Sequence, residues 1–218
     1  MLDLELERLI TQGEGSTVEC KSTVENAVKI AKTLAAFANT NGGTLLVGVA
    51  DDGTVCGVAS EYDVLAVIEA AAEQICEPPV SVSYQTVTAE GKLVLVFSIP
   101  ESEDKPHAVR DTGGDATVYV RFNDKSMPTS RATARHLEAN AAPPDKALLQ
   151  SPPVKALAKY LKTNEYVTAK RFAKFANLSD RRAARLLIDL AQSHYLIAVA
   201  RDKDVVYAIA PQPPKGEF

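Results

Sequence analysis

The chain has 218 residues, of which 46% are hydrophobic and 24% are charged, with a net charge of −4. This composition supports a substantial core in one or two domains. No apolar run reaches the roughly 18 residues of a membrane-spanning helix, and the acidic opening MLDLELERLI lacks the basic start of a secretory signal. The three cysteines form no CxxC pair, which favours reduced thiols in a cytoplasmic protein.

Charge is distributed unevenly along the chain. Residues 1–143 hold 11 Lys and Arg against 21 Asp and Glu, a net −10, whereas residues 144–218 hold 13 against 7, a net +6. A basic final third favours contact with a polyanion such as nucleic acid. The alternative is that these lysines only solvate helix surfaces.

The first elements indicate a buried helix between two strands. An apolar repeat over residues 2–10 predicts a short opening helix, and residues 17–21 predict a strand. Ser22 and Glu25 have capping-box spacing, which predicts a helix from there to about Asn39. Only a narrow polar strip interrupts its apolar positions, so we expect it to be mostly buried.

A glycine pair ends this helix. Gly42-Gly43 is followed by TLLVGVA (44–50), whose nearly continuous apolar run predicts a strand covered on both faces. Asp51-Asp52-Gly53 predicts a turn, after which TVCGV (54–58) returns as the hairpin partner of that strand.

The remaining pattern completes a mixed α/β (α+β) domain over residues 1–140. It predicts a helix capped by Ser60 that ends near Cys76, strands at 80–87, 92–99 and 117–122, and a closing helix at 130–139. Two Pro-Pro pairs mark residues 141–153 as a linker.

Residues 154–211 predict a winged helix-turn-helix domain, and residues 212–218 a tail. The expected elements are helices at 154–162, 168–176 and 179–194, and a hairpin of strands 196–200 and 205–210. In such a domain the second helix of the turn pair can enter the major groove of DNA.

Basic residues of this domain are the candidate nucleic-acid contacts, because cations bind phosphates and arginine also reads guanine edges. They are Lys170, Arg171, Lys174, Arg181, Arg182, Arg185, Arg201 and Lys203. Ser179 has the position of an N-cap, and Asp189 is placed to neutralise Arg185 in part. The alternative is a winged helix that serves dimerisation or protein contact.

Acidic residues of the first domain are candidate metal ligands. Glu14, Glu19 and Asp51, with Asp52 as a less certain choice, could converge on Mg²⁺ or Mn²⁺ in a nuclease, with Lys21 steadying a phosphate. The alternative is that they are solvated or structural acids. No G-x-x-x-x-G-K-[ST] loop occurs, so we expect no ATP cofactor.

The segments GEGSTVECK, IAKTLAAFANTNGGTLLVGVADDGTVCGV and VYVRFNDKSMPTSR resemble the Schlafen-type AlbA-like family of DNA-binding domains over about residues 10–135. Bacterial members with this resemblance often carry a C-terminal winged helix and are described as transcriptional regulators. In animal Schlafen proteins, related domains cleave RNA with three acidic residues. By this resemblance Glu14 and Glu19 look like the two glutamates, and Asp51, less certainly Asp52, would match the aspartate. Cys20 stands where an aromatic residue is common, and Ala50 occupies a position that is often acidic.

Together these observations predict a cytoplasmic, nucleic-acid-binding transcriptional regulator without a cofactor. It would contact double-stranded DNA through the winged helix, as a homodimer or a higher homo-oligomer. The alternatives are a nuclease dependent on Mg²⁺ or Mn²⁺, with Glu14, Glu19 and Asp51 as ligands, and a non-catalytic assembly module.

Overall fold

A computed structural model describes residues 3–110, 113–129, 134, 146–193, 195–201 and 204–210. The chain divides into two compact units, Met1–Met127 (unit 1) and Pro128–Phe218 (unit 2). Each unit has its own hydrophobic core. Together they form a mixed α/β protein with several sheets.

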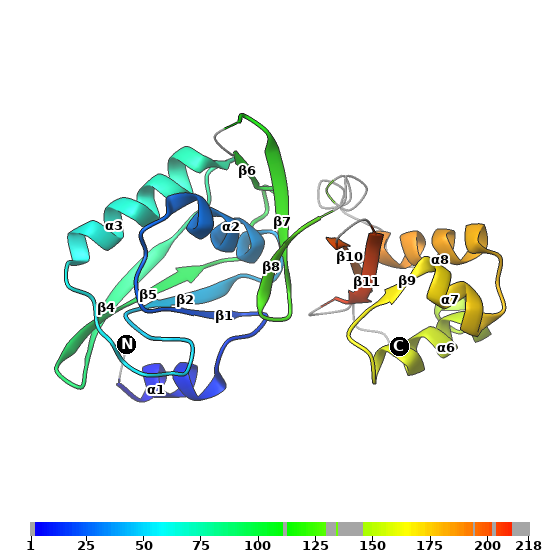
Figure 1. The fold of residues 1–218 in the computed structure, drawn as a ribbon, viewed down its shortest axis with the longest axis horizontal. Helices are drawn as coiled ribbons and strands as arrows, with labels where there is room; N and C mark the ends of the chain where they lie inside the picture. Colours follow the sequence, from blue (N-terminus) through cyan, green and yellow to red (C-terminus); the bar gives the residue numbers. More distant parts are fainter. Residues whose placement is uncertain are drawn as a thin grey trace. The chain divides into compact units, whose positions relative to one another are not determined.

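The central sheet of unit 1 has the strand order β1-β2-β5-β4 (Figure 1). β1 (Val18–Lys21) is parallel to β2 (Gly43–Val47), and the helix α2 (Ala27–Ala38) makes the crossover that parallel neighbours require. β5 (Lys92–Ile99) pairs in the antiparallel sense with both β2 and β4 (Ser83–Ala89). β1 is thus an edge strand of this sheet.

Helices cover the two faces of this sheet (Figure 1). Successive side chains of a strand point to opposite faces, so Leu45 and Val47 of β2 pack in the core that contains α2. Leu46 instead packs with Leu6 of α1 (Asp3–Gln12). All three β2 side chains are fully buried, which confirms the expected strand covered on both faces.

The start of α2 differs from the expectation. Asn26 is the N-cap, because its Oδ1 accepts a hydrogen bond from the Lys29 backbone N–H at 3.0 Å. The capping box predicted from Ser22 and Glu25 is wrong, and the helix begins several residues later. Asn is as good an N-cap as Ser, and the sequence analysis did not consider Asn26 for this position.

The end of α2 is confirmed at the glycine pair. The Gly42 N–H donates to the Phe37 carbonyl at 2.9 Å, and Gly42 has a φ of +68°. A Cβ at Gly42 would lie 2.7 Å from the Ile99 carbonyl oxygen of β5. Both the left-handed backbone and this close approach require glycine.

After β2 the chain turns as expected, but the return is shorter than a hairpin strand. The Gly53 N–H donates to the Ala50 carbonyl at 2.9 Å, which closes the turn. Residues 54–58 then return in the antiparallel sense, with one isolated bridge of Val55 with Val49 and a hydrogen bond from the Cys56 N–H to the Gly48 carbonyl at 2.8 Å, but they form no continuous strand. The expected strand over 54–58 is therefore wrong.

A second helical segment and a second sheet complete unit 1. Ser60 caps α3 (Glu61–Glu69) as expected, accepting from the Asp63 N–H at 3.2 Å, and the helix continues as the π-helical segment η1 (Ala70–Ile75). The second sheet has the order β3-β6-β7-β8. Its strands are β3 (Cys76–Glu77), β6 (Ala108–Arg110), β7 (Ala116–Phe122) and β8 (Lys125–Pro128).

Unit 2 packs helices beside a small antiparallel sheet. Its helices are α5 (Lys146–Leu149), α6 (Pro152–Leu161), α7 (Ala169–Ala176) and α8 (Asp180–Gln192). Its sheet has the order β10-β11-β9, formed by β10 (Leu196–Arg201), β11 (Asp204–Ile209) and β9 (Val167–Thr168). Two stretches predicted from the sequence lie outside the described residues: the helix at 130–139, apart from Ala134, and the tail at 212–218.

Candidate functional site

Three of the predicted site residues meet at β1. Glu19 and Lys21 lie two positions apart and so share one face of the strand, while Glu14 lies in the loop before it. Lys21 Nζ is 2.8 Å from Glu19 Oε1 and 3.6 Å from Glu14 Oε1. It also donates to the Cys20 carbonyl at 2.7 Å. The two glutamates and the lysine therefore form one ion-pair cluster.

Arg121 of β7 completes this cluster from a distant part of the chain. Its side chain is 0% exposed, and Nη1 lies 2.9 Å from Glu19 Oε2. The same guanidinium donates to Ser126 Oγ and to the Gly15 carbonyl, and it lies 4.7 Å from the ring centre of Phe37. One arginine thus joins β1, the loop before it, β8 and α2.

Sequence reasoning missed Arg121, although it lies in the VYVRF segment. The only local signal is a charged residue within an apolar strand pattern, and its partner Glu19 is 102 positions away. A buried arginine has to be paired to be tolerated, so the partner is essential to the interpretation.

Asp51, the third predicted acid, is exposed and lies near the cluster. Burial by itself lowers the pKa of Lys21, but the hydrogen bond and charge of Glu19, with the charges of Glu14 and Asp51, raise that pKa above its ordinary value. Asp52 serves the turn instead, because its Oδ1 accepts the Thr54 N–H at 2.9 Å and this bond lowers the pKa of Asp52.

The arrangement does not fit a divalent cation. Both Glu19 carboxylate oxygens contact cations, and Glu14 Oε1 accepts the Cys20 N–H at 3.1 Å. Mg²⁺ and Mn²⁺ need several oxygen ligands that are free to coordinate. Within the described part of the chain, no three His, Cys, Asp or Glu side chains are grouped so as to hold a metal ion.

Cys20 faces the opposite side of β1 and packs in the core beneath α1. Burial, followed by the nearby charge of Glu14, raises the pKa of the Cys20 thiol to about 11. The thiol is therefore protonated at neutral pH, which is unsuited to a nucleophile.

The predicted nucleic-acid contacts of unit 2 lie on the surface of α7, α8 and β10. The exposed ones are Lys170, Arg171, Lys174, Arg181, Arg182, Arg185 and Arg201; Lys203 lies outside the described residues. Within the described part of unit 2 none of them makes an ion pair within 4.0 Å, including the expected pair of Arg185 with Asp189. Arg201 instead lies 4.7 Å from the ring centre of Tyr166.

Two helix caps and a row of buried side chains position the helices that carry these cations. Ser179 Oγ accepts the Arg182 N–H at 3.4 Å, so α8 begins where the sequence predicted. Asn177 has a φ of 52° and ends α7 in the left-handed conformation. Ala183, Leu187 and Leu190 are fully buried on the other side of α8. The arginines therefore lie on its solvent face.

Comparison with known proteins identifies unit 1. Residues 14–130, more than half of the chain, match the family described as Schlafen, AlbA_2. The chain belongs to the Schlafen AlbA_2 family. No curated protein matches the chain. The matched range contains every residue of the ion-pair cluster, and the helices α6, α7 and α8 lie outside it.

Two solved structures are similar to parts of this family member. The N-terminal domain of an ATP-dependent DNA helicase RecG-related protein from Nitrosomonas europaea is 25% identical, with a TM-score of 0.39, and the match covers 50% of this chain and 79% of that one. The DIP2311 protein from Corynebacterium diphtheriae is 21% identical, with a TM-score of 0.44, covering 85% of this chain and 36% of that one. The chain thus spans about a third of the DIP2311 structure. Among the described residues, no helix combines the length and the apolar character needed to cross a bilayer.

Proposed function

We propose that the protein is a DNA-binding transcriptional regulator whose unit 2 is a winged helix-turn-helix domain. In this proposal α8 enters the major groove, α7 contacts the phosphate backbone, and the hairpin of β10 and β11 is the wing. A homodimer would present two α8 helices to a two-fold DNA site.

The observation that carries the proposal is the exposed cationic face of α7 and α8. Seven basic side chains are exposed there and on β10, and within the described residues none is offset by an ion pair. Unpaired cations on one face attract a polyanion, and arginine in a groove can bond guanine with two hydrogen bonds. The order of three helices and a hairpin is typical of the winged helix-turn-helix.

Membership in the Schlafen AlbA_2 family also agrees with a nucleic-acid-binding role, given the resemblance of unit 1 to AlbA-like DNA-binding domains. The ion-pair cluster of Glu14, Glu19, Lys21 and Arg121 gives no such support, because its charges offset one another. We therefore assign that cluster a structural role within unit 1.

The test is duplex binding by Arg181→Ala plus Arg185→Ala in the full chain. We expect affinity for a mixed-sequence duplex to fall on the order of tenfold or more at low salt, because each arginine would contact phosphate or base. Lys155→Ala plus Lys159→Ala is the matched control, since it removes two exposed cations from α6 of the same unit. Equal affinity of the arginine variant and this control would overturn the proposal.

A further inference from the structure

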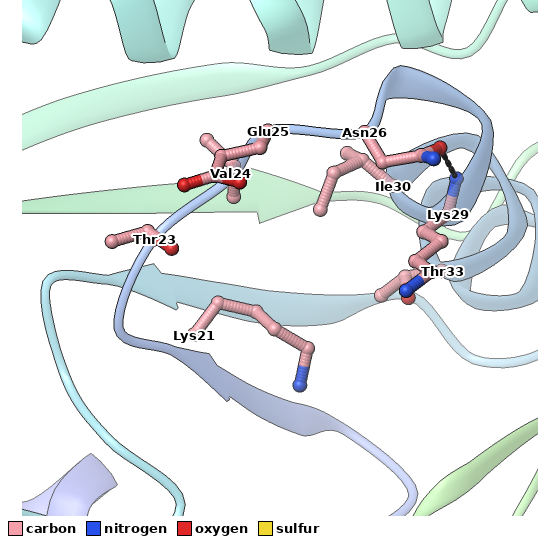
Figure 2. A pocket seen from close by; sticks show the side chains of 8 residues that line it. All are labelled: Lys21, Thr23, Val24, Glu25, Asn26, Lys29, Ile30 and Thr33. Atoms are coloured by element: carbon pink, nitrogen blue, oxygen red, sulfur yellow. Dashed lines mark hydrogen bonds between the residues drawn. The ribbon is translucent and has the colours of Figure 1, made fainter.

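The two edges of the central sheet in unit 1 differ in how far their backbone groups are bonded. At the edge formed by β1, which ends at Lys21 (Figure 2), the Cys20 N–H donates to Glu14 Oε1 at 3.1 Å and the Cys20 carbonyl accepts from Lys21 Nζ at 2.7 Å. The Val18 carbonyl accepts the Gly15 N–H at 2.9 Å. Side chains and a loop of the same chain thus occupy groups with which a further strand would pair.

β4 forms the opposite edge of this sheet (Figure 1). Its seven residues, SYQTVTA, include no charged residue and no proline, although charges and proline are the means by which edge strands commonly resist pairing. All of them are exposed except Val87 and Ala89, and Tyr84 is 48% exposed. β4 therefore has the properties of a strand that pairs with a strand of another chain.

The turn after β4 determines which of its backbone groups point outward. Glu90 and Gly91 have φ values of 53° and 73°, so they form a two-residue type I′ turn between β4 and β5. The residues that flank it, Ala89 and Lys92, exchange backbone hydrogen bonds, and bonded pairs alternate along the ladder from there. The residues whose N–H and C=O groups point away from β5 are therefore Tyr84, Thr86 and Thr88. In the part of the chain that the structure describes, these outward groups have no hydrogen bond.

Charge favours a second copy of this chain as the partner of β4. Residues 1–127 contain nine Lys and Arg against 20 Asp and Glu, a net charge of −11. Repulsion between like charges therefore opposes the association of two copies of unit 1 in general. β4 is uncharged, so pairing through it places no like charges opposite each other. The same strand offers no acidic side chain to a basic peptide.

We propose that two copies of the chain pair through β4 in the antiparallel sense across a two-fold axis, which joins their central sheets into one. Full overlap of the two strands places Thr86 opposite the partner's Thr86, and Tyr84 opposite the partner's Thr88. In this register the outward groups of all three residues form bonded pairs, with about six hydrogen bonds in total. Tyrosine and threonine are also a favourable cross-strand pair. The surface is thus complementary to itself, as a two-fold interface requires.

This interface supplies the homodimer of the proposed function and in that respect rests on it, but the pairing needs no DNA. It is therefore measured by sedimentation velocity of the full chain without DNA, over a wide range of concentration. Arg181→Ala plus Arg185→Ala should leave the dimer intact. A dimer together with unchanged duplex binding in this variant would remove the DNA contact and leave the interface. A monomeric chain whose duplex binding depends on these arginines would overturn the interface and leave the DNA contact.

Thr86→Lys and Thr86→Glu test the register, because directly opposite residues of an antiparallel pair lie about 5 Å apart. Each variant alone places two like charges at the centre of the interface, so we expect its dimer dissociation constant to rise about tenfold or more. An equimolar mixture pairs opposite charges and should restore association to within about threefold of the unmodified chain. This restoration would also show that both variants fold.

Thr23→Lys and Thr23→Glu are the matched controls, because Thr23 is an exposed threonine that follows β1 at the other edge of the sheet. We expect these variants to dimerise like the unmodified chain. Equal losses in the Thr23 and Thr86 variants, or no restoration in the mixture, would overturn the proposed pairing. An unmodified chain that stays monomeric at every concentration would leave β4 open to a strand of a different protein, and would also overturn it.

Residue-resolved amide hydrogen exchange distinguishes pairing through β4 from dimerisation through another surface. The N–H groups of Thr86 and Thr88 point outward and gain a partner only in the dimer, whereas the N–H of Val87 is already bonded to β5. We expect protection of the two threonine amides to rise on the order of tenfold or more between dilute and concentrated protein, with a smaller rise at Val87. No greater rise at Thr86 and Thr88 than at Val87 would overturn the proposal.

Discussion

Arg121 of unit 1 and Arg185 of unit 2 place the same guanidinium group in opposite settings. Arg121 is fully buried, bonded to Glu19 and stacked on Phe37. Arg185 is exposed on α8, and the described residues offer it no ion pair. A buried charge is tolerated only with partners and serves the fold, whereas an exposed unpaired charge keeps its hydrogen-bond donors for a ligand. Burial and pairing therefore distinguish an arginine that stabilises the fold from one that is available to a ligand. Residue type and sequence position do not make this distinction.

The largest effect expected from this comparison is on stability. Arg121→Met leaves the Glu19 carboxylate buried beside only Lys21, so we expect a loss of about 3–5 kcal/mol in the free energy of unfolding of unit 1. Urea denaturation of the full chain, followed by amide hydrogen exchange in β1 and β7, measures this loss for unit 1 alone.

The matched control is Arg110→Met, because Arg110 pairs with Glu77 at an exposed position where both side chains are more than half exposed. We expect this variant to lose about 0–1 kcal/mol. Arg121→Met plus Glu19→Met should recover part of the loss, since no unpaired charge remains. Similar losses for Arg121→Met and Arg110→Met would show that burial does not distinguish the two arginines.

The next effect concerns the helix that presents the exposed cations. Ser179→Ala removes the N-cap of α8 and should cost unit 2 about 1 kcal/mol, with weaker duplex binding because Arg181 and Arg182 lie in the first turn. Ser60→Ala removes the equivalent cap of α3 in unit 1, and its stability loss should leave duplex binding unchanged. Thermal melts measure the stability of the two variants, and fluorescence anisotropy with a labelled duplex measures their DNA affinity. Similar losses of duplex affinity in Ser179→Ala and Ser60→Ala would contradict the assignment of DNA binding to unit 2.

The smallest effect is a dependence of stability on alkaline pH. The folded-state pKa of Lys21 lies above its ordinary value of 10.5, so its ion pairs stabilise unit 1 fully below that pH and less as pH rises through the raised pKa. We expect Lys21→Gln to reduce the loss of stability above about pH 10.5 relative to the unmodified chain. Lys29→Gln, which removes an exposed lysine outside the ion-pair cluster, is the control. Identical alkaline profiles for Lys21→Gln and the unmodified chain would contradict this linkage.

Local signals predicted the elements of unit 1 where one residue controls the geometry. The glycine pair ends α2 because Gly42 needs a positive φ next to β5, and Ser60 caps α3. The conformation of residues 54–58 was harder to predict. Positive φ values at Gly48 and Gly57 bend the chain there and limit the strand pairing of this segment to the single bridge of Val55 with Val49. The short strands β3, β6 and β8 were also missed, since segments of two to four residues carry too little alternation to detect.

The site was only partly predictable for a related reason. Sequence analysis selected Glu14, Glu19 and Lys21, which lie close together along the chain, and the structure brings them into contact. It missed Arg121, because the contact with Glu19 depends on how two sheets are arranged. When Arg121 is not considered, Glu19 is a candidate metal ligand. When Arg121 is included, both carboxylate oxygens of Glu19 contact cations. The pairing, more than the residue type, decides what the acid can do.

The salt dependence of duplex binding tests the central claim most directly, that the exposed α8 arginines contact DNA. The plot of log affinity against log salt concentration is measured for the unmodified chain, for Arg181→Ala plus Arg185→Ala, and for Lys155→Ala plus Lys159→Ala. If both arginines bind phosphates, the slope of the arginine variant should be smaller in magnitude by about 2, at about 0.9 per contact, while the lysine variant keeps the original slope. An unchanged slope in the arginine variant would contradict the assignment of α8 to DNA.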